Sequence, residues 1–196
     1  TKAEIAYLET DPNAERRLLE EAASDKEKCL ELIGEKLPYI EKRGAVVPYT
    51  SIYGYQDTYW ALLGRLFKLT HNPEHMRRAI EVTQKAMETA VKLDMVSLIA
   101  ESYWKIASAQ ENLQERLAAA DNFQHASQNY LKAAKKIYRL EDLYQDHASY
   151  MLAWSEIEKA RHHHAKQEYS VAKGHYESAA KIHESLKKWN YLAPNY

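Results

Sequence analysis

The chain has 196 residues, of which 45% are hydrophobic and 28% are charged, and its formal net charge is −1. These values are typical of a globular domain, and a net charge near zero argues against nucleic acid as a partner. The only cysteine, Cys29, excludes an intrachain disulfide and a cysteine-based zinc site, and we predict a cytoplasmic location. The sequence has no run of about 18 apolar residues to span a bilayer, and residues 1–10 do not resemble a signal peptide.

Residues 1–50 are predicted to form a helical segment that packs on the rest of the chain. Asp11-Pro12 is typical of a helix N-cap followed by proline in the first turn. A capping-box pattern at Ser24 predicts a break or restart of the helix there, and Gly34 and Pro38 are expected to disturb it further. Further helices are predicted at about 57–69, 73–93, 95–113, 119–140, 142–160 and 165–189.

One hydrophobic stripe recurs along the chain, with alternating steps of four and three residues that place it on one side of a helix. One copy begins at Ala119 and another at Ala165, 46 residues later. A fainter copy, beginning at Met76, lies 47 residues upstream of the first. Repetition at such a period is typical of a stacked helical array. We therefore predict an all-α fold in which residues 51–196 form one continuous domain of repeats at about 51–94, 95–140 and 141–189.

The stripe places three tyrosines in the predicted core, namely Tyr130, Tyr169 and Tyr176. Alanines between them allow neighbouring helices to approach closely, and the aromatic rings fill the space between layers. A plain helical bundle would show a similar stripe, so that alternative to a repeat array stays open.

The segment from Trp60 to Phe67, with Leu63 and Gly64 between them, resembles the first helix of a tetratricopeptide repeat (Trp-x2-Leu-Gly-x2-Tyr). The resemblance covers about residues 55–189 and implies a right-handed array of antiparallel helix pairs, a TPR-like α-α superhelix. The repeats are longer than those of the family. The family's second-helix pattern, Ala-x3-Phe-x2-Ala, is matched at Ala119-Phe123-Ala126, Ala126-Tyr130-Ala133, Ala165-Tyr169-Ala172 and Ala172-Tyr176-Ala179.

The same resemblance implies a peptide-binding groove on the first helix of each pair. In that family, lysine, arginine and asparagine side chains in the groove hold peptide carboxylates, so we expect an acidic protein or peptide partner. If Tyr103 and Tyr150 anchor the later repeats in place of Trp104 and Trp154, Glu158 faces the groove and the basic pattern is lost. With the tryptophans as anchors, the candidate partner-binding residues are Arg65, Lys68, Lys105, Asn112, Lys159 and His162.

Motifs typical of catalytic or phosphate-binding sites are absent from the sequence. It has no glycine-rich phosphate loop and no Gly-x-Ser-x-Gly elbow. Glu158 with His162, and His164 with Glu168, have the spacing of metal ligands on a helix, but such pairs are common by chance. Glutamates such as Glu156 and Glu158 are interpreted as parts of solvated helix faces. We predict no catalytic residue, no cofactor and no metal site.

These observations favour a non-catalytic scaffold or adaptor of TPR-like type. The alternative is an enzyme or metal-binding protein on an all-helical bundle. An apolar layer at the end of the array is expected to allow self-association into a homo-oligomer.

Overall fold

The computed structural model describes residues 1–6, 8–9, 11–44 and 47–186. Over these residues the chain is all-helical and contains no strand, as predicted. It divides into two compact units, Thr1–Leu93 and Asp94–Tyr196, and each unit is described by itself.

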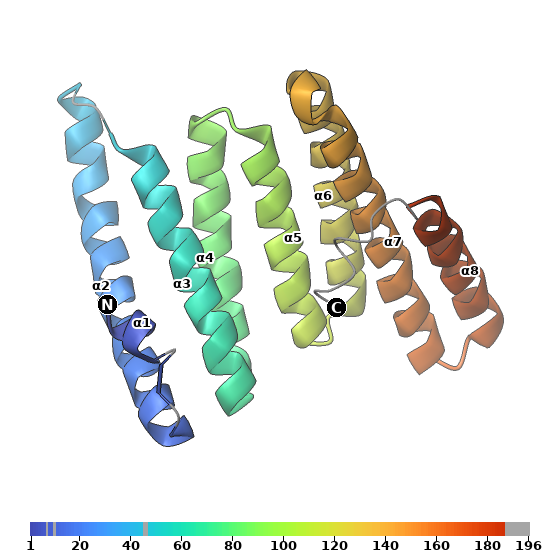
Figure 1. Cartoon of the computed structure of the whole chain (residues 1–196), viewed down its shortest axis with the longest axis horizontal. Coiled ribbons are helices and arrows are strands. Elements are labelled where there is room, and N and C mark those ends of the chain that lie inside the picture. Colours follow the sequence, from blue (N-terminus) through green and yellow to red (C-terminus); the bar gives the residue numbers. More distant parts are fainter. Residues whose placement is uncertain (7, 10, 45–46, 187–196) are drawn as a thin grey trace. The chain divides into compact units, whose positions relative to one another are not determined.

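Consecutive helices of the first unit pack on one another. Figure 1 shows α2, α3 and α4 side by side, with successive helices antiparallel. The core of this unit includes Tyr59, Leu63 and Leu66 of α3 and Ala79 of α4, all of them buried. The helices are α1 (Lys2–Ala6), α2 (Pro12–Lys42), α3 (Tyr49–Thr70) and α4 (Pro73–Lys92).

The start of α2 confirms the predicted cap, because the Asp11 side chain accepts a hydrogen bond from the backbone N–H of Asn13 at 3.1 Å. The predicted break near Ser24 is wrong, and α2 continues to Lys42. Pro38 is exposed and lies in the last turns of the helix. The backbone hydrogen bond that proline removes is therefore lost close to an end that frays in any case.

The second unit consists of two antiparallel helix hairpins in which each helix packs on the next along the chain. Its core joins small residues to aromatic rings: Phe123 stacks on Trp154 with ring centroids 6.0 Å apart, and Tyr130 stacks on Tyr144 at the same distance. The helices are α5 (Val96–Asn112), α6 (Arg116–Lys136), the short 3-10 helix η1 (Tyr138–Leu140), α7 (Glu141–Ala165) and α8 (Tyr169–Ser185).

The turns that close the two hairpins are alike. Gln114 and Gln167, 53 positions apart, both adopt left-handed backbone angles, with φ of 60° and 64°. The backbone N–H of Glu115 donates to the carbonyl of Gln110, and that of Glu168 donates to the carbonyl of His163, both at 2.9 Å. This pattern is the Schellman motif, which satisfies the last carbonyl groups of a helix.

The hairpin α7–α8 therefore repeats α5–α6 with an offset of 53 residues. The predicted offset of 46 residues is wrong, because it pairs Ala119 of α6 with Ala165, the last residue of α7. The two offsets differ by seven residues. Because the stripe advances in steps of four and three, its pattern repeats every seven residues and fits both alignments. Buried residues agree with the offset of 53: Ala100 with Ala153, Ser102 with Ser155, Ala107 with Ala160, Ala119 with Ala172, and Ala126 with Ala179.

Two of the three tyrosines assigned to the core are exposed. Tyr130 is buried as predicted, but Tyr169 is 59% exposed and Tyr176 is 40% exposed. Both lie on α8, which packs on α7 and buries Ala172 and Ala179. Tyr176 corresponds to Phe123 in the preceding hairpin, where α7 covers the ring.

Candidate functional site

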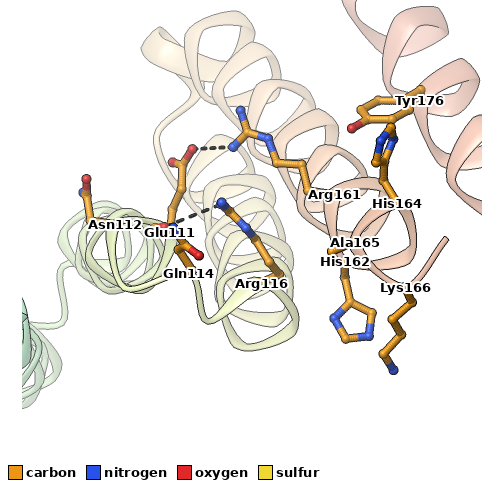
Figure 2. A pocket seen from close by; sticks show the side chains of 10 residues that line it. All are labelled: Glu111, Asn112, Gln114, Arg116, Arg161, His162, His164, Ala165, Lys166 and Tyr176. Carbon is orange, nitrogen blue, oxygen red and sulfur yellow. Dashed lines mark hydrogen bonds and ion pairs between the residues drawn. The ribbon is translucent and has the colours of Figure 1, made fainter.

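An open hollow of about 1000 Å³ lies in the second unit, where both Schellman turns meet α8. Figure 2 shows its side chains, which come from the end of α5, the start of α6, the end of α7 and the middle of α8. Basic side chains dominate its lining. The ten residues around it are Glu111, Asn112, Gln114, Arg116, Arg161, His162, His164, Ala165, Lys166 and Tyr176.

A network of charges forms the inner side of the hollow. The Glu158 side chain is fully buried, and its two oxygens accept from Arg116 Nη1 at 2.9 Å and from Arg161 Nη1 at 2.6 Å. Arg161 also donates to Glu111 Oε1 at 2.6 Å (Figure 2). Charge-assisted bonds of this kind hold planar guanidinium groups in a fixed orientation. The network therefore connects the end of α5, the start of α6 and α7 beside the hollow.

Protonation in the hollow follows from these contacts. Burial, the largest effect, lowers the pKa of Arg161, but hydrogen bonds to Glu111 and Glu158 outweigh it and the pKa is raised. Burial lowers the pKa of His162, and the charge of Lys166 lowers it further. The lowered pKa favours the neutral imidazole of His162 at pH 7, while Arg161 stays charged.

The outer side of the hollow keeps exposed polar groups. Lys166 and His164 are both exposed, and the His164 ring lies edge-on to Tyr169 with centroids 5.4 Å apart. Together with Arg116 and Arg161, Lys166 gives the hollow three permanent positive charges, against the carboxylates of Glu111 and of the buried Glu158 that binds both arginines, so one positive charge is in excess. An anionic group is the chemical class that such a lining favours.

Two of the predicted partner-binding residues line this hollow, on opposite sides of it (Figure 2). Asn112, at the end of α5, is exposed and donates its side-chain N–H to the carbonyl of Ser108 at 2.8 Å. His162 reaches the same space from the end of α7 (Figure 2). Their residue numbers differ by 50, and only the pairing of the two hairpins brings them together.

Lys105 and Lys159 lie elsewhere in the second unit. Lys105 is only 6% exposed, and its ammonium group contacts Glu101 at 2.5 Å. Lys159 is half-buried and contacts Glu156 at 2.8 Å. With the offset of 53 residues, Lys105 corresponds to Glu158, so these two lysines do not occupy equivalent positions of the two hairpins.

The remaining two predicted residues belong to the first unit. Arg65 forms an ion pair with Glu15 of α2, whose side chain is nearly buried. Lys68 lies one turn further along α3 and is exposed.

The two residue pairs whose spacing would suit metal ligands on a helix make other contacts. Glu158 is held by arginines rather than by His162, and Glu168 accepts from His163 at 2.5 Å rather than from His164. No group of three or more potential metal ligands is found in the part of the chain that the structure describes. The interpretation of Glu158 as part of a solvated helix face is wrong. The start of α6 covers this side chain, and Arg116 of that helix binds it.

A second ionic cluster joins α7 to α8. His175 Nδ1 lies 2.7 Å from Glu156 Oε2, and Lys159 contacts the other oxygen of the same carboxylate. The rings of His175 and His163 stack with centroids 5.5 Å apart. Burial, the largest effect, raises the pKa of Glu156, but hydrogen bonds from Lys159 and His175 together hold it below the ordinary value of 4.5.

Replacing Glu156 with glutamine is expected to flatten the stability profile in acid. Because folding lowers this pKa, the ionised carboxylate stabilises the fold fully above pH 4.5, and the contribution is lost as the pH falls through the lowered value. Below pH 4.5 the melting temperature of the wild type, measured by circular dichroism, should fall more steeply than that of Glu156→Gln. Glu184→Gln, an exposed change on α8, is the control, and parallel curves for wild type and Glu156→Gln would contradict the assignment.

Most of the lining escaped prediction from the sequence, including Glu111, Arg116, Arg161 and Lys166. A signal for the turns is present, since Gln114-Glu115 and Gln167-Glu168 repeat the same dipeptide 53 residues apart. When the two hairpin sequences are aligned on these turns rather than on the stripe, the ends of α5 and α7 occupy equivalent positions.

The chain matches no family model, and comparisons with curated proteins and with solved structures also found no match. Within the described ranges, every helix is too short or too polar to traverse a lipid bilayer.

Proposed function

We propose that this chain is a non-catalytic scaffold or adaptor of TPR-like type, a superhelical array of helix pairs that binds an acidic segment of a partner protein. Two features support an array: the offset of 53 residues between the hairpins α5–α6 and α7–α8, and the alanines buried at equivalent positions. The cytoplasmic location predicted from the single cysteine belongs to the same proposal.

The observation that carries the choice of partner is the lining of the hollow. Arg116 and Arg161 are held in place by Glu158, and Lys166 and His164 remain exposed beside them. Pre-oriented guanidinium groups bind carboxylates with little loss of side-chain entropy. An acidic segment can lie over the ends of α5 and α7, where the neutral His162 and the amide of Asn112 add hydrogen-bond donors.

The proposal is tested by fluorescence anisotropy with a labelled pool of peptides rich in aspartate and glutamate. A second pool has lysine and arginine in their place. We expect the wild type to bind the acidic pool, with an affinity that falls as salt is added, and to ignore the basic pool. Equal binding of both pools, or binding of neither, would contradict an acidic partner.

Lys166→Glu is expected to weaken binding of the acidic pool by about three- to tenfold, because it replaces an attraction with a repulsion. Lys181→Glu is the matched control, since it changes the net charge equally on an exposed position of α8 that does not line the hollow. Its effect should stay below about twofold. Equal losses in both variants would show that only the overall charge matters and would remove the hollow from the proposal.

A further inference from the structure

The face of α6 that receives α7 includes two side chains seven positions apart, which lie on the same side of the helix. Arg116 binds the buried carboxylate of Glu158, and Phe123 stacks on Trp154 with ring centroids 6.0 Å apart. On α7 the two contacting residues are four positions apart, so they are neighbours on its surface. An aromatic ring and an acid on one turn of α7 therefore occupy this face of α6 together.

The corresponding face of α8 carries two exposed tyrosines. With the offset of 53 residues, Tyr169 corresponds to Arg116 and Tyr176 to Phe123, and the two tyrosines are 59% and 40% exposed. Tyr176 also lines the hollow, which it reaches from the middle of α8 (Figure 2). Aromatic side chains are enriched where protein surfaces bind one another. Beside the hollow, α8 thus presents the face that receives a helix in the preceding hairpin.

Charge at the start of α8 favours an acid beside the aromatic ring. Lys166, three positions before Tyr169, is exposed and lines the hollow, where one positive charge is in excess. The two acids of this stretch, Glu168 and Glu177, each contact a basic side chain. Lys166 and the hydroxyl of Tyr169 both offer donors to a carboxylate.

We propose that the acidic segment bound in the hollow is helical and carries a tryptophan or phenylalanine four positions before an acid. This inference rests on the proposed function and names the side chains of the partner. The aromatic ring stacks on Tyr176 as Trp154 stacks on Phe123. The acid, one turn later, lies at the start of α8 within reach of Lys166. The packing of α7 on α6 is the template, and α8 presents the equivalent positions for it.

Three labelled, alanine-rich helical peptides test this proposal on the whole chain by fluorescence anisotropy. All carry the same two glutamates, spaced four positions apart. The first has tryptophan four positions before the first glutamate, the second has alanine in its place, and the third has tryptophan two positions before, on the other side of the helix. We expect the first to bind about tenfold more tightly than the others.

The outcomes separate this inference from the proposed function. Equal binding of all three peptides would overturn the aromatic contact but leave the acidic partner in place. Absence of binding by all three at low salt would contradict the acidic partner itself, and the aromatic contact with it.

Two variants test the assignment to α8. Tyr176→Ala should lower the affinity for the first peptide about tenfold, to that of the peptide without tryptophan. Tyr138→Ala is the matched control, since it removes a tyrosine that is 74% exposed and does not line the hollow, and it should change nothing. Tyr176→Ala that still prefers the first peptide would overturn the assignment. A wild-type dimer that Tyr176→Ala dissociates, measured by sedimentation, would also overturn it, because a second copy would then occupy this face.

Discussion

Replacing Phe123 with alanine is expected to lower the free energy of unfolding by about 3–5 kcal/mol, the largest effect that we predict. The Phe123 ring is 1% exposed, stacks on Trp154 of α7 and belongs to a core cluster with Ala119 and Ala126. Alanine removes the contacts of the ring and leaves a cavity that backbone movement refills only in part. Urea unfolding followed by far-UV circular dichroism measures the loss.

Tyr176→Ala is the matched control for this prediction. Tyr176 occupies the position of Phe123 in the next hairpin but is 40% exposed. Its loss should cost about 1 kcal/mol or less, because water already covers much of the ring. Comparable losses in both variants would mean that the faces of α6 and α8 are equally buried in solution, and that a partner or a second copy of the chain covers α8.

Glu158→Ala is expected to lower the free energy of unfolding by about 2–4 kcal/mol. The change removes both arginine contacts and leaves Arg116 and Arg161 facing each other without their shared carboxylate. These two side chains are 26% and 37% exposed, so water recovers part of the lost interaction, and the loss stays at the lower end for a buried ion pair.

Glu158→Gln separates the charge from the shape of the side chain. It should cost less than Glu158→Ala, because the amide oxygen still accepts one hydrogen bond. Glu184→Gln, on the exposed face of α8, should leave the unfolding curve unchanged. If Glu158→Ala unfolds like the wild type, Glu158 does not hold the two arginines, and their side chains in the hollow are not oriented in advance.

The sequence by itself determined the helical class and the cap at the start of α2. Few glycines and prolines, with apolar residues at steps of three and four, permit little besides helices. The Asp11 cap could be located because a side-chain oxygen followed by proline satisfies the first backbone N–H groups locally. Such features depend only on neighbours along the chain.

Only the tertiary structure decided the offset between the hairpins. A stripe that repeats every seven residues fits itself at 46 and at 53, so the apolar pattern of the sequence cannot choose between them. The Schellman turns at Gln114 and Gln167 choose 53, because a left-handed residue ends each helix at a fixed point.

The candidate sites also depended on packing. Asn112 and His162 could be named from the sequence, but their place in one hollow depends on how the ends of α5 and α7 pack. Glu158 looked solvated because its neighbours along the helix are charged, and its burial follows from α6 covering that face of α7.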